Sequence, residues 1–226
     1  MTDARPQYDA ILRFHDALHA HYGPTHWWPG ETPFEIAVGA ILTQNTAWTN
    51  VERAIDNLKA ADALDPRALL ARGDEELHEL LRPAGFFRVK TKRLLHFCRH
   101  LVDHYDGDMA RLAARPMPAL RRELLALHGI GPETADDILL YACDKPVFVI
   151  DAYTRRIFSR HGLCPPDIDY HALQALFEAH LPRDIHVYGE YHGLIVFVGK
   201  DFCRRSPKCD ACPLGPLLDP GQPVLS

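Results

Sequence analysis

The stretch that most constrains the fold is residues 124–162, LLALHGIGPETADDILLYACDKPVFVIDAYTRRIFSRHG. An apolar helix end is interrupted by Gly129 and Gly131, both of which are free to take positive φ. Pro132 suits the first turn of a new helix, and apolar residues recur after it at helical spacing. The stretch therefore predicts a helix, a tight hairpin and a second helix.

This hairpin and the residues after it carry groups suited to bind an anion and to do chemistry. Glycines at both turn positions leave backbone N–H groups bare at a helix N-terminus, which suits a phosphate; a helical corner without a ligand is the alternative. The apolar run 147–150 then leads to Asp151, and Tyr153 and Arg155 begin a polar, basic helix. Considered without the neighbouring motifs, Asp151 could be no more than the N-cap of this helix.

The combined pattern, LHGIGPETADDILLYA followed by VIDAYTRRIFSRHG, closely resembles the helix-hairpin-helix DNA glycosylases of the endonuclease III superfamily. The resemblance implies that the hairpin with Gly129 and Gly131 grips the backbone of damaged double-stranded DNA. It implies a monovalent cation at the hairpin as well. In this family the matching Asp151 carries the chemistry. Tyr153 is a candidate to line the base pocket, and Arg155, in a basic run, is a candidate DNA contact.

One position departs from endonuclease III proper, which places a lysine two residues after the second hairpin glycine. That lysine attacks the sugar and forms the Schiff base that leads to strand cleavage. Here the position is Glu133, and a carboxylate cannot form an imine. The departure implies base release with weak or no AP-lyase activity. Glu133 also suits an ordinary first helical turn, where its charge faces the helix dipole.

Two turns resemble the family's DNA-inserting segments. The stretch PFEIAVGAILTQNTAWTNVERAI places Gln44 where the family has the glutamine that fills the gap left by an extruded nucleotide. An amide suits this role because it offers donors and an acceptor to an orphaned base. A glycine-aromatic loop places Phe86 at the family's apolar wedge; a buried core pair of Phe86 and Phe87 is the alternative.

Three clustered cysteines indicate a metal or iron–sulfur site. The spacing is Cys203-x5-Cys209-x2-Cys212, whereas the family has four cysteines, spaced by six, two and five residues, around a [4Fe–4S] cluster. This chain is one residue short in the first interval, and Leu218 stands at the fourth position, with Asp219 next to it as a candidate oxygen ligand. An apo or zinc-bound segment is the alternative.

The charge distribution supports a DNA partner although the net charge of −5 does not. Three basic runs flank the turns described above and predict one DNA-facing surface. By resemblance, the cysteine loop would present Arg204, Arg205 and Lys208 to phosphates. The runs are Arg88, Lys90, Lys92 and Arg93; Arg155, Arg156 and Arg160; and Lys200, Arg204, Arg205 and Lys208.

Composition predicts an ordinary globular chain, with 226 residues and 47% hydrophobic content. No apolar run approaches the roughly 20 residues of a membrane helix, and no signal pattern opens the chain. A cytoplasmic monomer is expected, nucleoid-associated if the source is bacterial.

The long segments all have helical periodicity, so the fold class is all-α. The resemblance implies a two-lobed glycosylase with a DNA-binding cleft between the lobes. One lobe is a helical barrel with the hairpin, residues 32–140; the other combines residues 1–31 and 141–226 with the cysteine loop. The expected function is a base excision repair glycosylase that flips a damaged base and cleaves its N-glycosidic bond. A catalytically inactive lesion-binding protein and an ordinary helical interaction protein are the alternatives.

Overall fold

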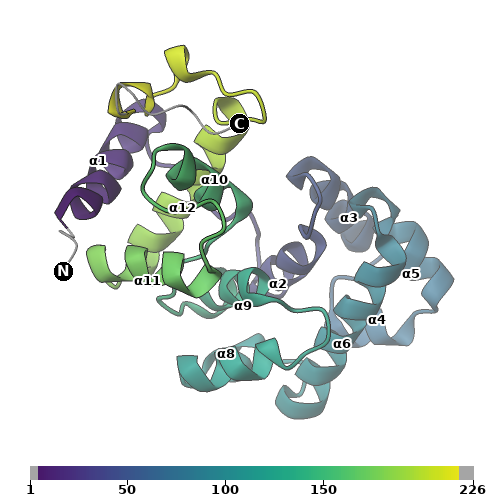
Figure 1. Cartoon of the computed structure of the whole chain (residues 1–226). Helices are drawn as coiled ribbons and strands as arrows, with labels where there is room; N and C mark the ends of the chain where they lie inside the picture. The colour runs from purple at the N-terminus through teal and green to yellow at the C-terminus, as the bar shows by residue number, and fades with distance from the viewer. Residues whose placement is uncertain (1–4, 219–226) are drawn as a thin grey trace. The chain divides into compact units, whose positions relative to one another are not determined.

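The computed structural model describes residues 5–218, which are all-helical and contain no strand (Figure 1). The prediction of an all-α fold is confirmed. The chain divides into two compact units, one made of residues 1–28 and 146–226 and the other of residues 29–145. Within residues 5–218, no helix combines the length and the apolar character needed to cross a membrane.

The unit of residues 29–145 is built around α2 (Pro33–Leu42), which is almost entirely apolar and buried. Thr32 caps this helix by accepting a hydrogen bond from the backbone N–H of Glu35 at 3.1 Å, and Pro33 occupies its first turn. The helix makes its most extensive contacts with three neighbours and thereby forms the centre of this unit's core. Those neighbours are α3 (Trp48–Ala60), α6 (Phe87–Tyr105) and the π-helical turn η2 (Ile138–Ala142).

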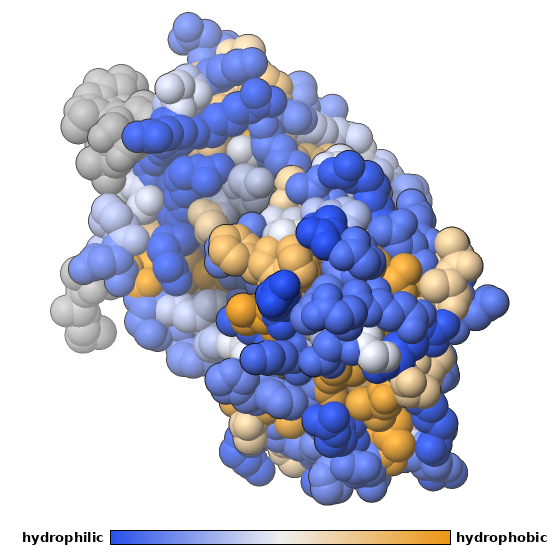
Figure 2. Space-filling model, turned by 90° about the vertical axis from the view of Figure 1, so that its right-hand side faces the viewer, coloured by the Kyte–Doolittle hydropathy of each residue, from blue (hydrophilic) through white to orange (hydrophobic). Residues whose placement is uncertain are grey.

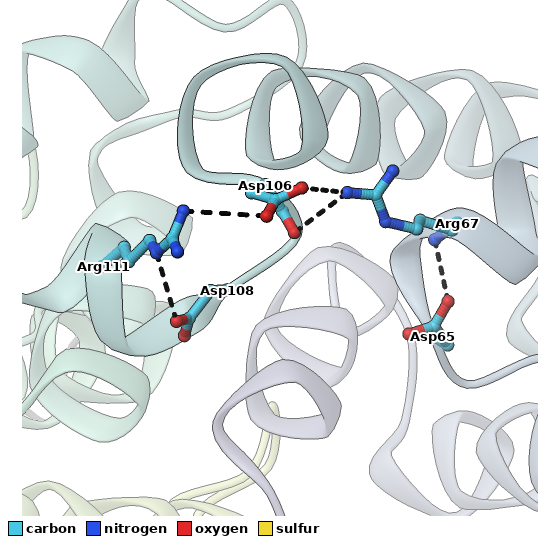
Figure 3. A network of polar contacts seen from close by, with 5 residues as sticks. All are labelled: Asp65, Arg67, Asp106, Asp108 and Arg111. Carbon is cyan, nitrogen blue, oxygen red and sulfur yellow. Dashed lines mark hydrogen bonds and ion pairs between the residues drawn. The ribbon is translucent and has the colours of Figure 1, made fainter.

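Shorter helices complete this unit, and polar contacts fix several of their ends. They are α4 (Pro66–Ala71), α5 (Asp74–Leu81), the 3₁₀ turn η1 (Arg82–Ala84), α7 (Met109–Ala113), α8 (Met117–Leu125) and α9 (Pro132–Asp137). Figure 3 shows how Arg67 and Arg111 both reach Asp106, the left-handed residue that ends α6. These side chains are exposed, so the pairs add little stability.

The other unit has an aromatic core between its helices. Phe148 stacks on Phe177 with ring centroids 4.2 Å apart, and Phe158 packs on Phe177 at 4.6 Å. The buried Tyr191 donates its hydroxyl to the backbone carbonyl of Ile11 at 2.7 Å, which ties the first helix to the last. The helices are α1 (Arg5–Tyr22), α10 (Ala152–Arg160), α11 (Tyr170–His180) and α12 (Ile185–Asp201), followed by the 3₁₀ turns η3 (Cys209–Ala211) and η4 (Gly215–Leu217).

Candidate functional site

The hairpin joins α8 to α9, and its two glycines play different parts. Gly129 has φ +91°, and a Cβ there would lie 2.2 Å from the Cγ atom of Arg93, so backbone and neighbour both require glycine. Gly131 is extended, with φ −90° and ψ 178°, and nothing lies within 4 Å of where its Cβ would be. Only Gly129 uses the conformational freedom that the sequence suggested for both. Gly131 instead leaves open space where α9 begins.

A buried ion pair clamps the two helices of the hairpin. The guanidinium of Arg121 on α8 donates from Nε and Nη2 to the two carboxylate oxygens of Asp136 on α9, at 2.7 and 2.9 Å. The Asp136 side chain is fully buried and that of Arg121 is 20% exposed. This bidentate geometry is the strongest form of such a pair, so it fixes the angle at which α9 leaves the hairpin.

Gln44 lies against the hairpin although 85 residues separate it from Gly129. Its Nε2 donates to the carbonyl of Gly129 and to the hydroxyl of Thr134, each at 2.9 Å, and its Oε1 accepts from Arg93. The orientation of the amide is thus fixed by three partners. The sequence did not indicate Arg93 or Thr134 as partners of Gln44, because neither lies near it along the chain.

Phe86 and Phe87 behave differently. Phe86 is 71% exposed and Phe87 is half-buried under the guanidinium of Arg82, which lies 4.9 Å from the ring centroid. The two rings therefore do not form a buried core pair. Hydrophilic residues predominate on the face shown in Figure 2, with apolar residues in small patches. Among the described residues, Phe86 and Val89 are the large hydrophobic side chains that are exposed.

Lys90 does not belong to a DNA-facing surface, which corrects the first of the three basic runs. It is buried, whereas Arg88 and Lys92 on the same helix are exposed. Its Nζ donates to the backbone carbonyls of Leu42 at 2.6 Å and Ala84 at 2.8 Å. Burial, with the positive charge of Arg93, lowers the pKa of Lys90 to about 8. Spacing alone could not reveal these carbonyl partners.

Asp151 forms the N-cap of α10 and keeps one carboxylate oxygen for another role. Its Oδ1 accepts from the backbone N–H and from the hydroxyl of Thr154, both at 2.7 Å. Its Oδ2 lies 3.7 Å from Nε2 of the buried His192 on α12. Burial would raise the pKa of Asp151, but the nearby His192 and the bonds from Thr154 outweigh it, so this pKa is lowered. Asp151 is therefore a carboxylate at neutral pH. The sequence did not indicate His192.

The other predicted residues near these elements are placed as follows. The ring of Tyr153 packs so closely on Gly199 that a Cβ there would lie 2.3 Å from it, and the Arg156 guanidinium lies 4.9 Å from the ring centroid. Arg155 is partly exposed on α10, and Glu133 is exposed in the first turn of α9. Tyr153 thus has a packing role in its own unit.

The second basic run is also corrected, because two of its arginines hold the cysteine loop. Arg156 donates to the carbonyls of Cys203 at 2.8 Å and Gly199 at 3.2 Å. The buried Arg160 donates to the carbonyls of Arg204 and Arg205 and, at 3.3 Å, to the sulfur of Cys203. Their charges are directed into the protein. In the third run, Arg204, Arg205 and Lys208 are exposed.

The three clustered cysteines line one cavity. Cys203, Cys209 and Cys212 line a cavity that opens to solvent, together with Arg160 and Leu218. Burial raises the pKa of the Cys212 thiol, and the neighbouring Cys203 and Cys209 raise it further. Within residues 5–218, no group of three or more His, Cys, Asp or Glu is arranged to hold a single metal ion. Asp219, the candidate oxygen ligand, lies outside the described residues.

The structure thus groups the predicted residues by unit. Gln44, Phe86, Glu133 and the hairpin belong to the unit of residues 29–145. Asp151, Tyr153, Arg155 and the cysteine loop belong to the other unit.

Comparisons with known proteins identify a family of similar sequences. Residues 38–183 match the HhH-GPD superfamily of base excision DNA repair proteins. A Methanocaldococcus jannaschii protein named as a DNA repair glycosylase is 46% identical over 210 residues, which are 92% of this chain and 95% of that protein. Endonuclease III of Thermotoga maritima is 30% identical over 184 residues, 80% of this chain and 79% of that one.

Solved structures show the same similarity. H. pylori 3-methyladenine DNA glycosylase bound to ethenoadenine superposes with a TM-score of 0.73 and 29% identity, covering 86% of this chain and 97% of that one. Endonuclease III in a non-covalent complex with DNA superposes with a TM-score of 0.80 and 24% identity, covering 96% of each chain. The chain therefore belongs to the HhH-GPD superfamily and is a base excision repair DNA glycosylase of the endonuclease III type.

Proposed function

We propose that this glycosylase is monofunctional: it releases a damaged base and has weak or no AP-lyase activity. The observation that carries the proposal is Glu133, two residues after Gly131, exposed in the first turn of α9. Strand cleavage through a Schiff base needs an amine as nucleophile, and the stretch from residue 128 to residue 144 contains no lysine. Hydrolysis by water is the route that this site leaves open.

Asp151 is the proposed catalytic carboxylate. Cleavage of an N-glycosidic bond builds positive charge on the sugar, and a fixed carboxylate stabilises that charge and activates a water molecule. The bonds from Thr154 orient the Oδ1 atom, and the lowered pKa keeps the group ionised. The bond from the Thr154 N–H is the helix cap itself, so it is the lowered pKa that supports a further role at the reaction centre.

The proposed DNA contacts follow from the need to take the target nucleotide out of the stack. Gln44 would fill the gap and the exposed Phe86 would act as the wedge. Backbone groups at Gly129 and Gly131 would hold the phosphates. Cations at the surface would add sequence-independent attraction to the DNA backbone; they are the exposed Arg204, Arg205 and Lys208 and the partly exposed Arg155.

An alkylated purine is the first lesion to test. The 29% identical H. pylori protein is named as a 3-methyladenine DNA glycosylase, and its structure contains ethenoadenine. Mismatched thymine is the second candidate, because a thymine-DNA glycosylase of Aeropyrum pernix is 26% identical over 196 residues. The proposed lack of a nucleophilic lysine favours either of these over oxidised pyrimidines.

The test incubates the protein with duplexes that each contain one lesion, analysed with and without alkali, and traps covalent adducts with borohydride. We expect strand breaks only after alkali and no trapped adduct. A covalent adduct in good yield would refute the monofunctional proposal. Tight lesion binding without base release would instead support a non-catalytic sensor, a function favoured by the loss of both the lysine and the fourth cysteine.

We also propose that Cys203, Cys209 and Cys212 hold an iron–sulfur cluster. Their lining of one cavity supports it, as does the hydrogen bond from Arg160 to the sulfur of Cys203, because hydrogen bonds to the sulfur ligands are a usual feature of iron–sulfur sites. Leu218, at the position of a fourth ligand, cannot ligate. The cluster would serve to fix the loop that carries the exposed cations.

Iron analysis of anaerobically purified protein tests this proposal. We expect a brown protein that contains iron, and Cys209→Ser is expected to lose both the colour and most of the iron because one of three ligands is gone. Cys164→Ser is the matched control: this cysteine is buried away from the cavity, and burial raises its pKa to about 11. Colourless, iron-free wild-type protein would exclude the cluster.

A further inference from the structure

The two turns with proposed DNA-inserting roles are joined inside the protein by one lysine. The turn after α2 carries Gln44, and the turn before α6 carries Phe86. Lys90, which is only 1% exposed, donates from Nζ to the carbonyl of Leu42 at the end of α2 and to the carbonyl of Ala84 in the second turn. A single ammonium group therefore bridges the two turns.

Thr46 makes the same connection from the other side. Its hydroxyl accepts a hydrogen bond from Nζ of Lys90 and donates to the carbonyl of Ala84 at 2.7 Å. Thr46 lies two residues after Gln44, whereas Ala84 lies two residues before Phe86. The two side chains and the carbonyl of Ala84 form a closed polar triangle between the turns.

The backbone beneath Phe86 needs this support. Phe86 is left-handed, with φ 44° and ψ 28°, and it follows Gly85, which has φ +64°. A bulky residue in this region is unfavourable and persists only where its surroundings hold it. The backbone N–H groups of Val89 and Lys90 both donate to the carbonyl of Phe86 at 3.0 Å. The main chain is thus fixed while the Phe86 ring is left exposed.

Gln44 is equally fixed at its far end. Its amide is held by Gly129, Thr134 and Arg93, and its turn is held through Thr46. Burying an ammonium among neutral oxygen partners costs desolvation free energy, which an apolar residue in the core would avoid. The presence of Lys90 in the core therefore indicates that the two turns must be held in position.

We propose that Lys90 and Thr46 are positioning residues that hold the Phe86 wedge and the Gln44 gap-filler as one rigid unit, so that both enter the duplex together. The inference rests on the DNA-inserting roles proposed above for Phe86 and Gln44. Neither Lys90 nor Thr46 needs to touch the reacting atoms. Their effect on DNA binding is transmitted through Phe86.

The test measures binding to a duplex that carries a tetrahydrofuran abasic analogue with 2-aminopurine as the neighbouring base, alongside the same duplex without the analogue. The variants are Thr46→Val, Phe86→Ala and the double variant, with Thr91→Val as control. Thr91 is a buried threonine next to Lys90 on α6 whose hydroxyl makes no hydrogen bond within the described residues. Circular dichroism establishes that each variant is folded.

We expect wild type to prefer the abasic duplex and to raise the 2-aminopurine fluorescence. Thr46→Val should weaken binding to the abasic duplex about tenfold, because it removes the hydrogen bonds to the ammonium of Lys90 and to the carbonyl of Ala84. Thr91→Val should leave this binding unchanged. In the Phe86→Ala background, the Thr46→Val effect should shrink to less than about twofold, since coupled residues are not additive. Lys90→Met, if folded, should resemble Thr46→Val.

Two results would overturn the inference while leaving the glycosylase proposal intact. One is that Thr46→Val binds the abasic duplex as tightly as Thr91→Val does. The other is that Thr46→Val weakens this binding about tenfold both in the wild-type background and in the Phe86→Ala background. Wild-type protein that fails to prefer the abasic duplex would instead reject the proposed insertion roles, and this inference with them.

Discussion

Asp151→Asn is expected to slow base release by a factor of between about 10² and 10⁴ under single-turnover conditions. The amide cannot stabilise the positive charge of the sugar as a carboxylate does, and it cannot accept a proton from water. The measurement is the rate of alkali-labile site formation, with enzyme in excess over a duplex bearing the preferred lesion.

The substitution suits this test because it preserves the local fold. Asparagine caps helices about as well as aspartate, so Oδ1 can still accept from the N–H of Thr154 at the start of α10. The matched control is Asp169→Asn, which changes the same residue type at the N-cap of α11 in the same unit. We expect the control to retain full activity. Equal rates for wild type and Asp151→Asn would exclude Asp151 as the catalytic group.

The pH dependence follows from the lowered pKa of Asp151. A carboxylate whose pKa is lower in the folded state contributes stability above its unfolded pKa, and loses that contribution as the pH falls through the folded value. The same ionisation governs activity. Across the neutral range, the rate of base release by the wild type should therefore not change through protonation of Asp151. Such a fall is expected only below the ordinary carboxyl pKa of 3.8.

Local chemistry explains which features the sequence could predict. Proline and glycine positions predicted the helix-hairpin-helix, and the order of apolar run, aspartate and basic helix start predicted an N-capping Asp151, as α10 shows. Phe86 follows a glycine with positive φ, which is typical of a turn that exposes its neighbour.

The features that the sequence could not predict depend on contacts between segments that lie far apart along the chain. Lys90, Arg156 and Arg160 have the spacing of a solvated basic face, yet their donors meet carbonyl groups at the ends of other segments. Nothing in a local pattern specifies where those carbonyls lie. Gln44 likewise meets the hairpin only because α2 packs against α9 and η2.

Asp136→Ala is expected to lower the free energy of unfolding by about 3 kcal/mol, the lower end of the range for breaking one side of a buried ion pair. Asp136 is fully buried, so its removal leaves Arg121 without its bidentate partner between α8 and α9. Because Arg121 is 20% exposed, solvent compensates part of its charge and the loss stays below the maximum. Urea denaturation followed by circular dichroism measures the change.

The matched control is Glu76→Ala, which removes the partner of Arg72. Arg72 is 20% exposed, as is Arg121, but Glu76 is 55% exposed. An exposed pair of this kind contributes about 0.5 kcal/mol or less. Equal losses for Asp136→Ala and Glu76→Ala would show that burial does not set the strength of the clamp.

A double variant separates the energy of the Arg121–Asp136 pair from the cost of leaving Arg121 without this carboxylate. Replacing Arg121 by Met and Asp136 by Leu removes both charges, and such apolar replacements are often neutral or stabilising. We expect this variant to recover most of the stability lost in Asp136→Ala. Its hairpin would lack the bidentate bonds that set the angle of α9, so weaker binding to an abasic duplex at restored stability would show that the clamp serves the geometry of the hairpin.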